Sequence, residues 1–129
     1  MKTILVVDDE IDLVDLLAWN LNLKGYKVMV AYDGAEAISA VEHDVPDLVL
    51  MDVMMPRMDG MTALRRLRQG HKTKHVPIVL VTARRESSMI FDAVKGGATD
   101  VMLKPFSMTD LMQWVERWLS GNCMQLTYS

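Results

Sequence analysis

The sequence has a single cysteine, Cys123, among 129 residues. An internal disulfide is therefore impossible, which fits a protein of a reducing compartment, and we expect a cytoplasmic location. Long apolar runs are also missing. The first apolar run ends at Asp8, which is too early for the apolar segment of a signal peptide, and no stretch reaches the length of a membrane-spanning helix.

The sequence also lacks a strong excess of charge of either sign, since its formal net charge is -3. This balance gives no overall attraction to nucleic acid or to an anionic membrane, so we expect neither as a direct partner. No linker and no low-complexity segment divides the chain. Half of the residues are hydrophobic and 24% are charged, which is typical of a globular protein. We therefore expect one domain over residues 1–121, followed by a short tail over residues 122–129.

What the sequence does contain is a repeated strand–helix pattern with short connections. Apolar and β-branched runs predict strands over Thr3–Val7, Lys27–Tyr32, Asp47–Met51, Ile78–Val81 and Thr99–Leu103. Apolar residues at helical spacing predict helices over Ile11–Lys24, Ala35–Glu42, Met61–Gln69, Glu86–Lys95 and Ser107–Leu119. Alternation of this kind predicts a doubly wound α/β fold, in which helices cover both faces of a parallel five-stranded sheet.

Polar side chains stand where these predicted strands end. Asp8 and Asp9 follow the first strand, Asp52 the third, Thr82 the fourth and Lys104 the fifth. Ligands of open parallel sheets bind beyond the carboxyl ends of the strands, at the point where the strand order reverses. With the strand order 2-1-3-4-5, the first and third strands are neighbours at that point, and the three aspartates face one another.

Three crowded carboxylates raise each other's pKa values, so either they share protons or a cation holds them ionised. A ligand set made of carboxylate oxygens suits Mg2+ or Mn2+ better than Zn2+. Lys104 adds a fixed positive charge, and Thr82 adds a hydroxyl donor. Together with Asp52 as the attacking carboxylate, these are the parts that phosphoryl transfer requires.

The same residues carry a resemblance to a known family. The pattern consists of Asp8-Asp9, Asp52 with Met-Met-Pro-Arg-Met-Asp-Gly behind it, Thr82-Ala83 and Lys104-Pro105-Phe106. In this order and at strand ends, it resembles the receiver domain of two-component response regulators, over about Lys2 to Leu119. The resemblance implies a flavodoxin-like fold.

The resemblance also implies roles for the acids. Asp52 would be the phosphoacceptor, taking a phosphoryl group from the phosphohistidine of a sensor histidine kinase or a phosphotransfer protein. Asp9, Asp52 and the backbone carbonyl of Met54 would bind Mg2+ directly, and Asp8 would act mostly through water. The domain would catalyse only its own phosphorylation and dephosphorylation, so it would not be an enzyme in the ordinary sense.

Further roles follow from the resemblance for the residues at the fourth and fifth strand ends. Thr82 would hydrogen-bond the new phosphoryl group. Lys104 would pair with Asp52 before the transfer and with the phosphoryl oxygens after it, and the Lys104–Pro105 peptide bond would be cis. The fourth helix, the fifth strand and the fifth helix would form the switched surface, which would bind an effector or a second copy of the domain.

The sequence departs from the family pattern at two places. Receivers often have Tyr or Phe three residues before the lysine, where this chain has Val101. Valine has no ring to relocate, so we do not expect the usual aromatic readout. Met54 and Arg84 occupy the positions that flank the path of the hydrolytic water in the family. Because an apolar Met54 orients water poorly, we expect a long-lived aspartyl phosphate.

Three alternatives remain at this stage. A Mg2+-dependent phosphatase with an aspartyl nucleophile would carry a second acid two residues after Asp52, where this chain has Met54. A nucleotide- or flavin-binding protein would need a Gly-rich or hydroxyl-rich loop after the first strand, whereas Asp8 and Asp9 would repel phosphate. A receiver that has lost phosphorylation would not be expected to keep the full set of site residues.

Other polar features have ordinary structural interpretations. We expect Asp8 or Asp9 to cap the first helix as well, and Asp33 to cap the second, which explains Asp33 fully. His71 and His75 are four residues apart, but they lie in a poor helix between a glycine and a proline, so we predict no metal site there.

Two surface patterns need an interpretation. The basic run from Arg65 to Lys74 predicts a solvated face rather than a nucleic-acid site, because no aromatic residues are interleaved with it. The last helix has an apolar stripe that Met112 and Trp114 widen. This width predicts either a broad core contact or a partner surface to which Trp114 or Trp118 contributes.

Overall fold

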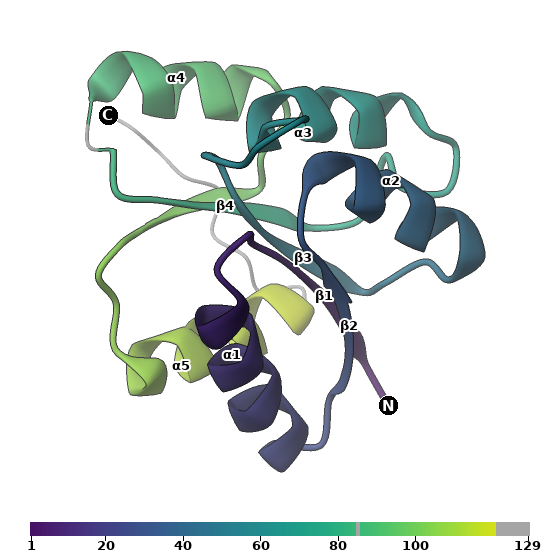
Figure 1. Cartoon of the computed structure of the whole chain (residues 1–129), viewed down its shortest axis with the longest axis vertical. Helices are drawn as coiled ribbons and strands as arrows, with labels where there is room; N and C mark the ends of the chain where they lie inside the picture. The colour runs from purple at the N-terminus through teal and green to yellow at the C-terminus, as the bar shows by residue number, and fades with distance from the viewer. Residues whose placement is uncertain (85, 121–129) are drawn as a thin grey trace.

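The computed structural model describes residues 1–84 and 86–120, which form five strand–helix units (Figure 1). The strands are β1 (Thr3–Val7), β2 (Lys27–Ala31), β3 (Leu48–Asp52), β4 (Ile78–Thr82) and β5 (Asp100–Leu103). The helices are α1 (Ile11–Leu23), α2 (Gly34–His43), α3 (Gly60–Gln69), α4 (Ser87–Lys95) and α5 (Met108–Leu119). The predicted tail over residues 122–129 lies outside the described residues. Within the described part, no helix combines the length and the apolar character needed to cross a membrane.

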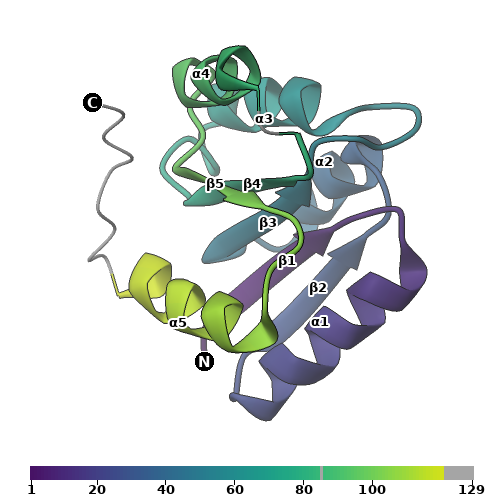
Figure 2. The same ribbon diagram turned by 90° about the vertical axis from the view of Figure 1, so that its left-hand side faces the viewer.

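The five strands form one parallel sheet in the order β2-β1-β3-β4-β5 (Figure 2). This order confirms the predicted doubly wound architecture. β1 lies between β2 and β3, and Val7 at the end of β1 is opposite Met51 in β3. The carboxyl ends of β1 and β3 therefore lie side by side at the point where the strand order reverses, which is where open α/β sheets bind ligands.

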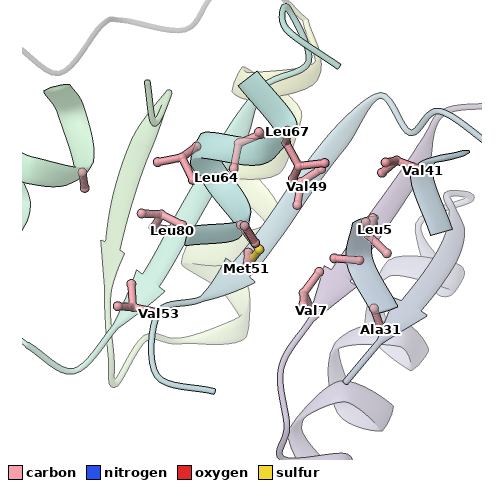
Figure 3. Close-up of a cluster of buried hydrophobic side chains, with 14 of the residues drawn as sticks. Leu5, Val7, Ala31, Val41, Val49, Met51, Val53, Leu64, Leu67 and Leu80 are labelled. Atoms are coloured by element: carbon pink, nitrogen blue, oxygen red, sulfur yellow. The ribbon is translucent and has the colours of Figure 1, made fainter. Parts of the chain in front are cut away.

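The helices form two layers around the sheet. α2, α3 and α4 cover one face, and α1 and α5 cover the other (Figure 2). Leu5 and Val7 point into the first core, whereas Ile4 and Val6 point into the second, because successive side chains of a strand lie on opposite faces. Figure 3 shows the first core, where Leu64 of α3 packs against the strands. Both faces are covered, which explains why the inner strands are almost continuously apolar.

The N-termini of α1 and α2 differ in how they are capped. Asp33 caps α2 as predicted, and its carboxylate accepts a hydrogen bond from the Glu36 backbone N–H at 2.8 Å. The prediction that Asp8 or Asp9 caps α1 is wrong. Glu10 occupies the N-cap position without a side-chain capping bond, and the Asp8 carboxylate accepts a hydrogen bond from the Glu10 N–H at 2.9 Å. This bond holds Asp8 at the end of β1, ahead of the helix.

Candidate functional site

The candidate site lies at the carboxyl ends of the inner strands. Asp52 and Thr82 are the last residues of β3 and β4, whereas the sequence predicted that each would directly follow its strand. Asp8 follows β1 directly. Carboxylate oxygens of Asp8, Asp9 and Asp52 lie within 4.8 Å of one another. The strand order thus brings together acids that come from two distant parts of the chain.

Lys104 lies among these acids. Its Nζ is 3.2 Å from Asp8 Oδ2, 3.4 Å from Asp52 Oδ1 and 3.9 Å from Glu10 Oε1. The peptide bond from Lys104 to Pro105 is cis, as the family resemblance implied. One lysine faces several carboxylates, so the cluster keeps an excess of negative charge.

Asp52 is the acid that this environment affects most, since only 7% of its surface is exposed. Burial, followed by the charge of Asp8, raises the pKa of Asp52 from 3.8 to about 6, although Lys104 acts in the opposite direction. Burial favours the neutral form of Lys104, but Asp52 and Asp8 outweigh that effect and raise the lysine pKa above its ordinary value. A cation bound beside Asp52 would therefore relieve an unfavourable charge.

Thr82 and Met54 differ sharply in exposure. Thr82 is fully buried, its hydroxyl accepts a hydrogen bond from the Arg84 N–H at 3.0 Å, and its carbonyl accepts one from the Lys104 N–H at 2.8 Å. The second bond ties the ends of β4 and β5 together beside Asp52. Met54 is 62% exposed and lines a groove of about 500 Å³ together with Arg84 and residues of α3 and α4.

The loop between β3 and α3, which contains Met54, is anchored through two glycines. The Gly60 N–H donates to the Val53 carbonyl at 2.9 Å, and a Cβ at Gly60 would overlap the backbone of β3. The Gly34 N–H donates to the Met58 carbonyl at 3.1 Å, and a Cβ at Gly34 would come within 2.7 Å of that oxygen. Both positions need glycine because the backbones approach so closely.

A family model described as the response regulator receiver domain matches residues 4–116. The chain belongs to this family. Receiver domains are the phosphorylation-dependent signalling modules of two-component response regulators, and they interact with histidine kinases and effector domains. The strand-end acids, the threonine and the lysine of this receiver domain are the residues on which the sequence resemblance rested.

The chain is similar to receiver domains of known proteins. The alkaline phosphatase synthesis transcriptional regulatory protein PhoP of Bacillus subtilis (strain 168) is 47% identical over 109 residues, which cover 82% of this chain and 43% of PhoP. The chain thus spans less than half the length of this curated relative. The chemotaxis protein CheY4 of Vibrio cholerae has a solved structure that matches with a TM-score of 0.88 and 30% identity, over 92% of this chain and 99% of that chain.

A third similar protein was solved with a metal ion in its active site. The receiver domain of a sensor histidine kinase from Pseudomonas aeruginosa PAO1, solved with a magnesium ion coordinated in the active site cleft, matches with a TM-score of 0.84 and 29% identity. The match covers 92% of this chain and 98% of that chain. The flavodoxin-like fold that the sequence predicted is therefore confirmed by the structures of these relatives.

The acids of this receiver domain fit a divalent cation. Asp8, Asp9 and Asp52 offer only oxygen donors, and these donors lie close enough together to share one ion. Asp8 and Asp52 are buried, so their charges are weakly screened by water. Burial, and after it the charge of Asp8, raise the pKa of Asp52, so a cation bound there would favour its ionised form. The carbonyl of Met54 stays a predicted further ligand.

Sequence reasoning missed one contact of the loop between β3 and α3. Arg57, which has a left-handed φ of 66°, forms an ion pair with buried Asp33 and lies 3.5 Å from Glu36. The Glu36 N–H, and after it the Arg57 charge, lower the pKa of Asp33 despite its burial. Capping alone therefore does not explain Asp33 fully. No sequence signal could have shown this pair, because it joins a loop to a helix start 24 residues earlier.

The remaining candidate residues lie outside the acidic cluster. His71 and His75 are exposed and contribute to no cluster of possible metal ligands within the described ranges. Trp118 is buried, and its Nε1–H donates to the Asp100 carboxylate at 3.2 Å, so this part of the α5 stripe is a core contact. Trp114 stacks on Trp118 but is 42% exposed, so it is the tryptophan of this pair that a partner could reach.

Proposed function

We propose that this receiver domain accepts a phosphoryl group on Asp52 from the phosphohistidine of a sensor histidine kinase or a phosphotransfer protein. The observation that carries the proposal is the place of Asp52 at the end of a buried strand, within reach of two further acids and Lys104. A charge buried at a strand end costs free energy unless it is paired, and nothing in the packing of β3 requires one.

Mg2+ is the cation that we propose for the acidic cluster, and Mn2+ suits the same oxygen donors. Asp9, Asp52 and the Met54 carbonyl would bind the ion directly. Asp8 would act through water, because its two oxygens already accept hydrogen bonds from the Glu10 N–H and Lys104. When bound, the ion neutralises charge on the phosphoryl oxygens. The magnesium in the Pseudomonas receiver domain supports this assignment.

In the proposed transfer, an Asp52 oxygen forms a bond to phosphorus while the bond from phosphorus to the donor imidazole nitrogen breaks, and its electron pair stays on that nitrogen. A pKa of about 6 leaves Asp52 mostly ionised at neutral pH, which is the nucleophilic form. Lys104 exchanges its contact with Asp52 for the phosphoryl oxygens. The Thr82 hydroxyl oxygen already accepts a bond from Arg84, so its own proton is available to donate to the phosphoryl group.

The output surface that we propose consists of α4, β5 and α5. Phe91, Val94 and Trp114 are exposed on the two helices by 63%, 37% and 42%. Exposed apolar side chains of this kind suit an effector or a second copy of the domain. Because Val101 replaces the aromatic residue of many receivers, the signal would pass through Thr82, α4 and shifts of the backbone.

We further propose that the receiver domain extends over residues 1–121 and acts in the cytoplasm. It would catalyse only its own phosphorylation and dephosphorylation. The phosphatase alternative has no support, because the second position after Asp52 is Met54 and not an acid. The match of the receiver family over residues 4–116 supports the proposed extent.

The test is incubation with Mg2+ and acetyl phosphate, followed by intact mass spectrometry. We expect a single phosphoryl adduct in the wild type and none in Asp52→Asn, with circular dichroism used to establish that the variant is folded. An adduct that persists in folded Asp52→Asn would move the phosphoacceptor elsewhere. No adduct with donor and metal in excess would overturn the proposal.

A further inference from the structure

The charge of this chain is strongly segregated. No acidic residue occurs between Asp59 and Glu86, yet this segment contains seven of the 14 Lys and Arg residues and two of the three histidines. All 17 acids lie elsewhere, so the net charge of -3 conceals a basic segment in an otherwise acidic chain. Such segregation creates a local positive potential that the overall charge does not indicate.

Four exposed cations of this segment come from α3 and the loop that follows it, and we call them the α3 platform. Arg65 and Arg66 are on α3, and Lys72 and Lys74 are in the loop that leads to β4 (Figure 1). All four are exposed, and none forms an ion pair within residues 1–84 and 86–120. The dipole of α3 favours a cation such as Arg66 in its last turn, but it does not account for the two lysines beyond the helix.

A half-buried arginine, Arg68, fixes the loop that contains the two lysines of the platform. Arg68 Nη1 donates to the carbonyls of Thr73 at 3.0 Å and Val76 at 2.6 Å, and its Nε donates to the carbonyl of Gly97 at 2.8 Å. The loop after α3 is thereby fixed against the turn that precedes β5. The backbone around the two lysines is ordered before any partner binds, which lowers the entropic cost of binding.

We propose that the α3 platform binds the phosphate backbone of double-helical nucleic acid without reading its sequence. Exposed Lys and Arg side chains make the phosphate contacts that dominate such binding. No large apolar side chain is exposed on α3 or in the 70–77 loop of the described chain. A protein partner would need an apolar centre in the interface. The segment 61–77 also contains no Phe, Tyr or Trp on which unpaired bases could stack.

Lys72 and Lys74 lie at the far end of the sheet from the proposed phosphorylation site, whereas Arg65 lines the groove beside Met54. α3 runs back from the carboxyl ends of the strands, so its last turn and the following loop lie near the amino end of β4. The proposal therefore does not rest on phosphoryl transfer. It replaces the expectation, drawn from the sequence, that the basic run is only a solvated face. The sequence showed the charges, but it did not show that all four are exposed on α3 and the loop after it, without an ion pair among the described residues.

The experiment measures fluorescence anisotropy of a labelled duplex DNA of about 20 base pairs, long enough to span four phosphate contacts, titrated with the full chain at several salt concentrations. We expect log K to fall with log salt with a slope of up to about -3.6, since each of four phosphate contacts contributes about -0.9.

The double variant Lys72→Gln with Lys74→Gln should weaken binding about tenfold at low salt and reduce the magnitude of the slope by about 2. The control variant, Lys24→Gln with Arg117→Gln, makes the same change in net charge on the other face of the sheet, and its affinity should stay within about twofold of the wild type.

Three results would overturn the proposal. Equal weakening in the platform and control variants would show that only net charge matters. Binding without salt dependence, or no binding at about 25 mM salt, where phosphate contacts are strongest, would exclude a phosphate-backbone interaction. Stronger binding of polyglutamate or of phosphatidylserine vesicles than of the duplex would assign the platform to an acidic protein or to a membrane surface.

Discussion

Asp52 is held where its negative charge is unfavourable. Its pKa is about 6 in the folded protein against 3.8 without the fold, so the folded state binds more protons between these values. The free energy of unfolding of the metal-free protein should therefore fall as the pH rises from about 4 to about 6. Asp52→Asn removes this cost and should raise the free energy of unfolding at pH 7 by about 1–3 kcal/mol.

Urea unfolding with a chelator, at pH values from 4 to 7, measures this effect. The difference between Asp52→Asn and the wild type should grow across that window. The exposed acid Asp15 is a matched control, because Asp15→Asn should change stability little at any of these pH values. A difference that does not change with pH would contradict the raised pKa of Asp52.

Met54 should control the lifetime of the phosphorylated state. Its exposed, apolar side chain lies two residues after Asp52 and offers no hydrogen bond to an attacking water. Met54→Asn supplies an amide that can orient water, and it should speed loss of the phosphoryl group about tenfold, equivalent to about 1.4 kcal/mol in the barrier. Met54→Leu keeps the side chain apolar and should leave the rate unchanged. The measurement is decay of the phosphoryl adduct after the donor is removed, and a wild-type half-life of seconds would show that Met54 is no barrier to hydrolysis.

In addition to its apolar core contacts, α3 is tied to the segments before β4 and β5 by the hydrogen bonds of one side chain, Arg68. Arg68 bonds to carbonyls before β4 and before β5, and these partly buried acceptors would lose their donor in Arg68→Met. We expect a loss of about 2–4 kcal/mol in the free energy of unfolding by urea. Arg68→Lys should recover only part of that loss, because an ammonium cannot reach all of these oxygens at once. Arg65→Met on the exposed face should cost less than about 0.5 kcal/mol, and a similar loss in both variants would contradict this role.

The start of α2 contains two interactions of different strength. The capping bond from the Glu36 N–H to the buried Asp33 carboxylate is part-buried, whereas the Arg57 side chain that pairs with Asp33 is 72% exposed. Asp33→Ala should therefore cost about 1–2 kcal/mol in thermal or urea unfolding, as the loss of a helix cap does. Arg57→Gln should cost under about 1 kcal/mol, because exposed ion pairs contribute little. A larger loss in Arg57→Gln than in Asp33→Ala would reverse this order.

For the whole molecule, the acidic cluster joins the ends of β1 and β3, so an ion bound there should stabilise the entire fold. We expect Mg2+ at a hundred times its dissociation constant to raise the free energy of unfolding by about 2.7 kcal/mol. Thermal unfolding over a Mg2+ titration measures the effect, and Na+ at matched ionic strength separates it from salt screening. Asp9→Asn should weaken or abolish the Mg2+ effect. An equal gain in Asp9→Asn would place the ion elsewhere.

Much of this molecule follows from local sequence patterns. The alternation of apolar runs and helical spacing predicted every element of the described chain to within one residue at each end. The acids of the site were predictable because each stands where an apolar run stops. The capping role of Asp33 was also predictable, because a capping bond joins residues only three apart in the sequence.

Tertiary structure decided what depends on contacts between distant segments. The pairing of Arg57 with Asp33, and of Trp118 with Asp100, could not be read from spacing, because each joins elements that only the fold brings together. Asp8 was wrongly expected to share the capping of α1, since the Glu10 N–H and Lys104 take its oxygens instead. The sequence by itself determined which residues could act and at which strand ends. Only the packing of β1 beside β3, and of β5 beyond β4, determined which charges meet, because electrostatic interactions depend on distance and burial rather than on order along the chain.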